Sequence, residues 1–176
     1  MRAKSLTNKK KKQQPISFVG RYEVTVLTDK RIILPANVIR QLRDHGTERI
    51  LPCKLPGSRA LALCPENLWG RWVNKIKKSF PCLRTHNGAI TFLIPWQPIS
   101  WDTKGRITLP RRAREYTGIK ADDTVIIMGM DYCFELWPEK EFNDRVRECE
   151  ADLRKSVQFS LPIENVLNSA KDLKSH

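Results

Sequence analysis

Polar and apolar side chains alternate through Arg-Tyr-Glu-Val-Thr-Val-Leu at residues 21–27. A period of two with β-branched residues is typical of a strand that has one buried face. Residues 124–128 are apolar without a break and predict a second strand. Asp131-Tyr132 then predicts a turn into a third strand at 133–137, and Pro56-Gly57-Ser58 predicts a similar turn earlier in the chain.

Helical spacing follows two prolines. Val38, Ile39 and Leu42 can share one face of a short helix after Pro35. We expect Pro35 and Pro110 at the first helical position, where no amide hydrogen is needed. The helix after Pro110 should end near Gly118, because glycine readily adopts the left-handed conformation of a helix cap.

Two longer helices are predicted at 65–78 and 138–155. Each has an apolar stripe, formed by Leu68, Trp72 and Ile76 in the first and by Phe142, Val146, Cys149 and Leu153 in the second. Such stripes indicate core or subunit contacts rather than a cofactor site.

Three segments are harder to assign. Residues 90–94 suit either a strand or a helix, with a turn at Asn87-Gly88 before them. Pro95 and Pro98 restrict pairing there to a sheet edge or a crossing. Residues 156–176 predict a weak terminal helix with Ile163, Val166, Leu167 and Ala170 on one side.

The chain contains an internal repeat. Arg-Ile-Ile-Leu-Pro at 31–35 returns as Arg-Ile-Thr-Leu-Pro at 106–110, and residues 61–69 return at 134–142. Each copy reads as strand, tight turn, motif, short helix, two strands, and Pro-Glu before a longer helix. Two ordered landmarks at nearly constant spacing predict a duplicated α+β unit.

The charge balance points to a polyanionic partner or an anionic membrane surface. Among 176 residues, 32 Lys and Arg face 19 Asp and Glu, a formal net charge of +13. Residues 1–16 hold six basic residues and no acidic one, and the rest of the chain is still basic. We expect 1–17 to be a disordered tail, either simply solvated or contacting phosphates without specificity.

Several classes of protein find no support. Five cysteines without CxxC spacing and three histidines predict neither a zinc site nor any other cofactor, and suit reduced thiols in a cytosol. No secretory leader and no run of about 20 apolar residues is present, so a membrane is not expected. There is no P-loop, HExxH or nucleophile elbow, and the carboxylates of Glu148 and Glu150 look solvated. The sequence therefore predicts neither an enzyme nor a small-molecule substrate.

The repeated motif concentrates basic residues. Four basic residues face one acidic residue at 28–43, and five face two at 102–115. Basic side chains beside a turn and a helix start can contact phosphates, and arginine forks can read guanine in the major groove. The candidate DNA-binding residues are Lys30, Arg31, Lys104, Arg106, Arg111, Arg112 and Arg114.

A structural role is the alternative. Asp102 lies four residues before Arg106 across a Thr-Lys-Gly turn, so the two can pair and fix that turn. Gly105 would supply a backbone angle that other residues resist. The remaining basic residues can be ordinary solvated surface, and the two roles can hold together for Arg106.

At these motifs the chain resembles the MraZ family, whose members carry two SpoVT/AbrB-like repeats. The resemblance covers roughly 18–155 and is strongest in WDTKGRITLPRRAREYTGI at 101–119, followed by FELWPEKEF at 134–142. The family pattern of Asp, Gly-Arg, Pro and Arg is met by Asp102, Gly105, Arg106, Pro110 and Arg114. The first copy departs from it, with Leu27 at the Asp position, Lys30 at the Gly position and Ile39 at the helix Arg. Asp29 would replace that Asp only in a shorter turn.

The resemblance implies two pseudo-symmetric repeats with swapped hairpins and flanking helices, at 18–80 and 81–155, before a C-terminal tail at 156–176. It implies a ring-shaped homo-oligomer that binds double-stranded DNA at short G-rich promoter repeats. It further implies repression of a division and cell-wall gene cluster, in the cytoplasm at the nucleoid. An antitoxin-like module with secondary DNA binding and a basic RNA-binding protein remain the alternatives.

Overall fold

The computed structural model describes residues 17–84 and 93–157, which fall into two compact units, 1–139 and 140–176. Predictions for the basic tail, for the Asn87-Gly88 turn with most of 90–94, and for the terminal helix at 156–176 lie almost wholly outside the described residues. The described residues form an α+β fold, as expected.

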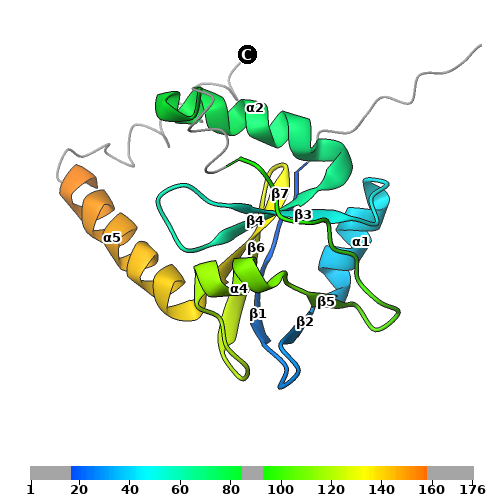
Figure 1. The fold of residues 1–176 in the computed structure, drawn as a ribbon. Helices are drawn as coiled ribbons and strands as arrows, with labels where there is room; N and C mark the ends of the chain where they lie inside the picture. The colour runs from blue at the N-terminus through cyan, green and yellow to red at the C-terminus, as the bar shows by residue number, and fades with distance from the viewer. Residues whose placement is uncertain (1–16, 85–92, 158–176) are drawn as a thin grey trace, which may run out of the picture. The chain divides into compact units, whose positions relative to one another are not determined.

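A five-stranded antiparallel sheet organises the first unit (Figure 1). Its order is β1-β6-β7-β4-β3, so strands from the two ends of the unit lie next to one another. The strands predicted from alternation and from apolar runs are confirmed. Their bounds are β1 Arg21–Thr25, β3 Ile50–Lys54, β4 Leu61–Pro65, β6 Thr124–Met130 and β7 Cys133–Pro138.

The two repeated motifs pair with each other. The strands β2 (Arg31–Ile33) and β5 (Arg106–Thr108) form a separate two-stranded antiparallel sheet, in which Ile32 lies opposite Ile107. Both isoleucines are fully buried. We call this pair of strands the ribbon.

A short helix follows each strand of the ribbon, α1 (Ala36–Asp44) and α4 (Arg111–Thr117). Pro35 and Pro110 are the N-caps rather than the first helical residues, so the prediction was wrong by one position. Their φ angles of −55° and −53° suit the proline ring, while ψ near 145° keeps them extended. Gly118 ends α4 with a φ of 73°, the left-handed cap that the sequence predicts.

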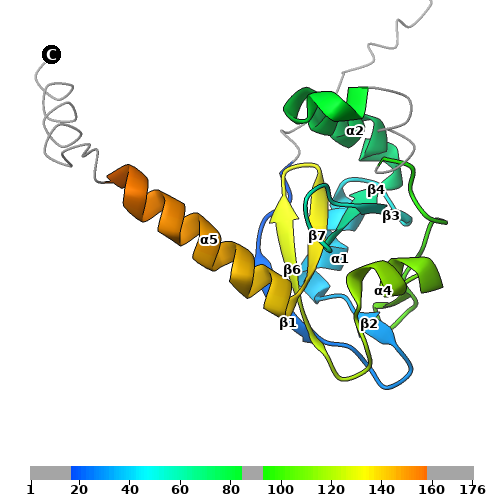
Figure 2. The same cartoon turned by 60° about the vertical axis from the view of Figure 1, so that its left-hand side comes forward.

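The two faces of the sheet carry different hydrophobic clusters. The larger cluster joins one face to the ribbon, α1 and α4, with Ile32, Val38, Ile107 and Ala113 among its buried members. The smaller cluster lies on the opposite face under α2 (Trp69–Ser79), where Trp72 is buried. A 3-10 turn, η1 (Glu66–Leu68), precedes α2, and another, η2 (Pro81–Arg84), follows it. Figure 2 shows α2 and α4 at different sides of the sheet.

Residues 93–100 run along the outer edge of β3. Ile50 and Ile99 exchange backbone hydrogen bonds of 2.8 and 2.9 Å, and the Trp96 amide donates to the Pro52 carbonyl at 2.9 Å. An edge position tolerates Pro95 and Pro98, because a proline there withdraws no donor from a central ladder.

The second unit holds almost all of α5 (Glu139–Val157). Phe142 is buried and Val146 half-buried, but Cys149 and Leu153 are exposed, so the predicted stripe is covered only at its N-terminal end. Ion pairs join Arg145 to Glu148 and Arg147 to Asp144 on its surface. No helix within the described residues is long and apolar enough to cross a membrane.

Candidate nucleic-acid interface

Asp102 organises the turn that leads into β5. Its backbone amide donates to the Arg106 carbonyl, and its Oδ1 accepts the amides of Lys104 at 2.9 Å and Arg106 at 3.0 Å. Gly105 completes the turn with a φ of 76°. A Cβ at Gly105 would lie 2.7 Å from the Ile39 Cδ1, so the turn packs closely against α1.

The turn before β2 has the same backbone pattern without the aspartate. The Leu27 amide donates to the Arg31 carbonyl at 2.8 Å, and the Lys30 amide donates to the Leu27 carbonyl at 2.7 Å. Lys30 adopts a φ of 64°, so it holds the left-handed position that Gly105 holds in the second copy.

Asp29 nevertheless binds Arg31 from inside this turn. Its Oδ1 accepts the Arg31 amide at 3.1 Å, and its Oδ2 accepts the Arg31 Nε at 2.7 Å. The expectation that Asp29 would serve only in a shorter turn is therefore wrong. The turn keeps its length. Asp29 lies two residues after Leu27, the position that aligns with Asp102, and its carboxylate reaches Arg31 from there.

The two arginine–aspartate pairs form one cluster. The Arg106 Nε donates to the Asp102 Oδ2 at 2.6 Å, and the Arg31 Nη1 lies 3.9 Å from the same oxygen. The hydrogen bond from Arg106 lowers the pKa of Asp102 to about 2. The hydrogen bond between Asp29 and Arg31 lowers the pKa of Asp29 and raises that of Arg31. These contacts favour the charged forms of both carboxylates and of Arg31.

The arginines lie on the outer face of the ribbon. Side chains alternate between faces of a strand, so the buried Ile32 and Ile107 put their neighbours outward. That outer face carries Arg31, Ile33, Arg106 and Thr108. Each guanidinium uses Nε and one terminal nitrogen, Nη2, for an aspartate, which leaves the N–H groups of the other terminal nitrogen, Nη1, for a ligand.

Each turn lies beside the helix of the other copy. A hollow of about 430 Å³ is lined by Lys30 together with Arg111 and Arg114 of α4. A second hollow, of about 590 Å³, is lined by Lys104 together with Arg40 and Arg43 of α1. Basic residues from both copies therefore surround the ribbon at both ends.

The predicted arginines of α4 differ in their surroundings. Arg114 is half-buried and donates to the Leu109 carbonyl, which ties the helix to the end of β5. Arg111 is exposed and pairs with Glu115 at 2.7 Å. Arg112 is exposed and makes no hydrogen bond or ion pair within the described ranges. Lys30 and Lys104 are exposed at the tips of the turns.

Comparisons with a family model and with known proteins bear on this arrangement. The family model described as "MraZ protein, putative antitoxin-like" matches residues 96–159. A "Transcriptional regulator MraZ" from Treponema denticola is 27% identical over 143 residues, covering 80% of this chain and 95% of the relative. Proteins of the same name from an Anaeromyxobacter species and from Bacteroides thetaiotaomicron are 26% and 24% identical over 74% and 87% of this chain, and over 90% and 94% of their own lengths.

The chain is a relative of the MraZ proteins. The resemblance stated from the motifs is thereby confirmed. MraZ proteins are not a family of enzymes, which confirms the expectation that this chain is not one.

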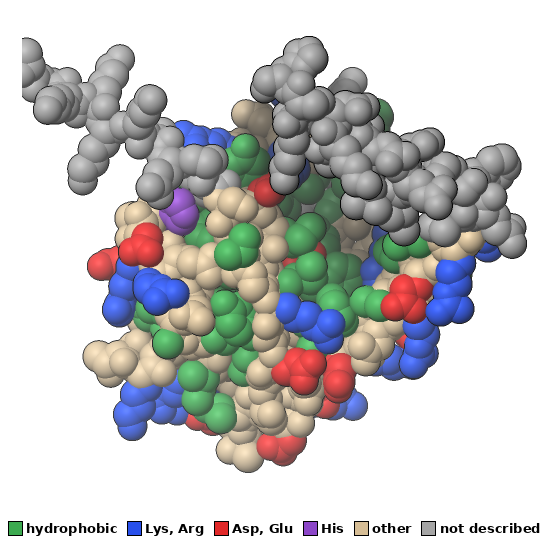
Figure 3. Space-filling model, turned by 180° about the vertical axis from the view of Figure 1, so that it is seen from behind, with side chains coloured by type: hydrophobic (Ala, Val, Ile, Leu, Met, Phe, Trp, Pro, Cys, Tyr) green, Lys and Arg blue, Asp and Glu red, His purple; other side chains and the backbone are tan. Residues whose placement is uncertain are grey.

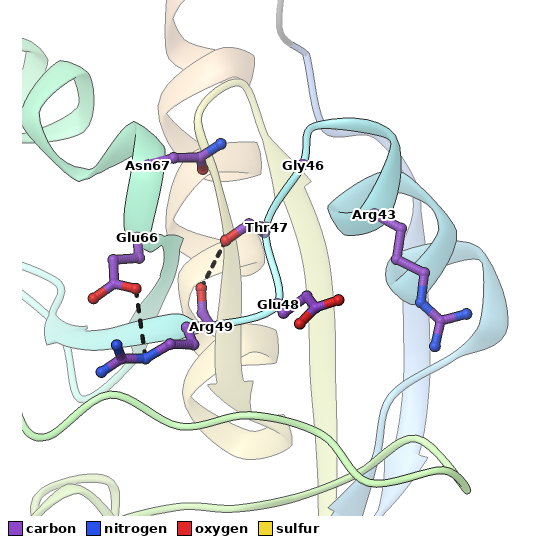
Figure 4. Close-up of a pocket in the computed structure, with 7 residues that line it drawn as sticks. All are labelled: Arg43, Gly46, Thr47, Glu48, Arg49, Glu66 and Asn67. Atoms are coloured by element: carbon purple, nitrogen blue, oxygen red, sulfur yellow. Dashed lines mark hydrogen bonds and ion pairs between the residues drawn. The ribbon is translucent and has the colours of Figure 1, made fainter.

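A further hollow of this MraZ relative lies away from the ribbon (Figure 4). It measures about 540 Å³ and is lined by Arg43, Arg49, Glu66 and four neighbours. The Arg49 Nε lies 3.5 Å from Glu66, and the Thr47 hydroxyl donates to the Arg49 carbonyl at 2.9 Å. The two arginines of this hollow are matched by two glutamates, Glu48 and Glu66, so the hollow lacks the excess of basic residues found beside the ribbon.

The face seen from behind also differs from the ribbon. In Figure 3, hydrophobic side chains gather near the centre, and charges of both signs surround them. The ribbon is therefore better suited to bind a polyanion than this surface of mixed charge.

The cysteines are structural where they are buried. Cys53, Cys64 and Cys133 lie on the adjacent strands β3, β4 and β7 under α2. Burial raises the pKa of the Cys53 thiol to about 12 and raises those of Cys64 and Cys133 as well. These thiols are therefore unreactive. Within the described part of the chain, no group of three His, Cys, Asp or Glu is placed to hold a metal ion.

Sequence reasoning missed two residues of this surface, Ile33 and Thr108, and gave Asp29 a role only in a shorter turn. The alternation in Arg-Ile-Ile and Arg-Ile-Thr was a usable signal, since it puts the first and third residues on one face of a strand. No comparable signal showed that Asp29 binds Arg31 in a turn of unchanged length, because this role depends on how the turn folds.

Proposed function

We propose that this chain is a sequence-specific DNA-binding regulator of transcription. The observation that carries the proposal is the ribbon, whose outer face presents Arg31 and Arg106, each fixed by an aspartate. The name of the relatives, transcriptional regulator MraZ, supports the same function.

The ribbon has the right form for a duplex. The major groove of B-DNA admits a two-stranded β-ribbon, and arginine forks there can bind O6 and N7 of guanine. An aspartate that already holds the guanidinium reduces the entropy lost when the arginine binds a base. Lys30, Lys104 and Arg112 are exposed beside the ribbon and can contact phosphates.

We further propose that two pseudo-symmetric copies with swapped hairpins build the first unit. Ile32 lies opposite Ile107, its own counterpart in the sequence repeat, and Ala62 lies opposite Glu135, again its counterpart. A two-fold axis through both pairs would relate the halves. The swap is supported by β1, which pairs with β6 of the other copy. Such symmetry would place Arg31 and Arg106 in equivalent positions on DNA.

The finer function follows the family resemblance. The proposed regulator is a repressor of a division and cell-wall gene cluster that binds short promoter repeats as a ring-shaped homo-oligomer. It would act in the cytoplasm at the nucleoid. Several ribbons in one ring would bind repeated sites together more tightly than one ribbon binds a single site.

A mobility-shift assay tests the proposed function directly. The full chain is titrated against the duplex upstream of its own gene, with unrelated duplex and structured RNA as competitors at the same salt concentration. We expect the unrelated duplex and the RNA to compete far more weakly than the upstream duplex. Equal competition by unrelated DNA would reject sequence-specific binding, and stronger competition by RNA would favour the RNA-binding alternative.

One observation keeps a second function open. The matching family model carries the words "antitoxin-like" in its description. The alternative is a partner-binding module with secondary DNA binding. Purification of the chain together with its neighbouring gene product separates the two, because a toxic, stoichiometric partner would favour the alternative.

A further inference from the structure

The outer face of the ribbon is nearly symmetric in its arginines but not in their neighbours. Ile33 and Thr108 occupy matching places in the repeat, each two residues after the arginine of its own strand. Across the ribbon, Ile33 lies opposite Arg106 and Thr108 lies opposite Arg31. Each arginine therefore has a chemically different cross-strand neighbour.

Both neighbours are available to a ligand. Ile33 is 43% exposed, which is unusual for a large apolar side chain on a strand whose other isoleucine is fully buried. Thr108 is also exposed, and the hollow that it lines contains the polar side chains of Gln97 and Ser100. Ile33 lines the hollow of about 590 Å³ described above, where Pro35 and Ile39 add apolar surface beside the basic residues.

The difference matters for base recognition. Directly opposed residues of an antiparallel pair have Cβ atoms about 5 Å apart, so each neighbour lies beside the base pair that its arginine would reach. An isoleucine can contact the methyl group of thymine but forms no hydrogen bond. A threonine hydroxyl can donate to or accept from a base edge.

We infer that Ile33 and Thr108 are specificity-determining residues that make the two halves of the DNA site unequal. Ile33 selects thymine beside the base read by Arg106. Thr108 selects, through a hydrogen bond of its hydroxyl, a donor or acceptor at one position on the base edge beside the base read by Arg31. The inference rests on the proposed DNA-binding function and assigns its sequence preference to two residues outside the basic set.

Selection of bound sites from random duplex DNA tests this inference. The full chain is compared with Ile33→Thr, which makes the two neighbours alike, and with Thr108→Val, which removes the hydroxyl at nearly constant shape. Thr25→Val, which changes an exposed strand position outside the ribbon, is the matched control. All three changes keep a β-branched side chain, which suits a strand.

For the unchanged chain we expect a site whose two halves differ. Ile33→Thr should reduce the preference for thymine in one half roughly tenfold, the cost of one mismatched base pair. Thr108→Val should relax the other half by a similar factor, and the Thr25→Val control should retain the original site.

The outcomes separate the inference from the function on which it rests. If the unchanged chain selects a clear site and Ile33→Thr and Thr108→Val select the same one, the inference is overturned and DNA binding stands. If the unchanged chain selects no site, the proposed function fails with it. Melting temperatures show that the variants are folded, and Ile33→Ser and Thr108→Ala replace any variant that is not.

Discussion

At the scale of single residues, two aspartates at different positions in their turns each bind the arginine of their own motif. Asp102 binds Arg106 from the start of its turn, whereas Asp29 binds Arg31 from inside the turn. The first pairing follows from sequence spacing. The second does not, because an ungapped alignment compares positions along the chain and says nothing about how far a side chain reaches.

The carboxylate of Asp102 should titrate abnormally. Its pKa of about 2 in the folded protein lies below the ordinary 3.8 because Arg106 donates to it. A lowered pKa means that the pair stabilises the fold fully above about pH 4 and that this contribution is lost as the pH falls from 3.8 towards 2. Carboxyl carbon NMR measures the titration. In Arg106→Ala the pKa should return towards 3.8, and an unchanged value would exclude Arg106 as the cause.

Arg106 should matter more for DNA than for folding. Arg106→Ala is expected to weaken binding of the specific duplex by about 1–3 kcal/mol, the worth of one bidentate base contact. Arg106→Lys should also bind poorly, because lysine keeps the charge but lacks the planar fork. Fluorescence anisotropy gives the affinities, and circular dichroism with thermal melting is the control. A variant that unfolds would show that the pairing with Asp102 was the main role.

The two left-handed turn residues should respond in opposite directions. Gly105→Ala is expected to lower the free energy of unfolding by about 1–2 kcal/mol, because alanine is strained at a φ of 76° and its Cβ would press on Ile39. Lys30→Gly should raise it by up to about 1 kcal/mol, since it relieves the same strain at a φ of 64°. Urea denaturation measures both. Equal effects of one sign would contradict the equivalence of the turns.

At the scale of elements, the ribbon depends on its inner face. Ile107 is fully buried against the main core, so Ile107→Ala should cost about 2–5 kcal/mol of unfolding free energy. Thr108→Ala, one residue further and exposed, is the matched control and should change stability by less than about 1 kcal/mol. Chemical denaturation of both variants checks this, and similar losses would mean that the ribbon is not anchored by Ile107.

Most elements of the first unit were predictable because their periods are clear. The alternation at 21–27 and the apolar run at 124–128 became β1 and β6, and the stripe of Leu68, Trp72 and Ile76 became η1 and α2. What the pattern could not show is pairing. The partners of β1 and β2 lie far along the chain, and hydrophobic period alone contains no information about which distant strand is opposite.

At the scale of the whole molecule, basic residues of both copies lie around the ribbon. Lys104 is exposed at a turn tip and should contact a phosphate, not a base. Lys104→Ala is therefore expected to weaken specific and unrelated duplexes alike. It should reduce the slope of log affinity against log salt concentration by about 1. Titrations at several salt concentrations measure the slope, and a change confined to the specific duplex would assign Lys104 to base reading.

The proposed boundaries at 18–80 and 81–155 describe copies in the sequence and stay a prediction. In the structure, the copies share a sheet, a ribbon and a core, and residues 1–139 form one compact unit. The candidate site likewise combines both copies, which the duplication predicts only in outline. Its arginines and lysines were predictable from charge. The roles of Asp29, Ile33 and Thr108 became visible only with the folded turn and the strand register.

The pairing of β1 with β6 and of β2 with β5 also constrains how the protein is made. A ribosome releases the first copy long before the strands that complete it exist. In the nascent chain, β1 and β2 therefore lack their partner strands until residues near 130 emerge. Unpaired strand edges are prone to pair with other chains. A messenger RNA truncated near codon 80 would therefore encode a first copy that cannot fold by itself.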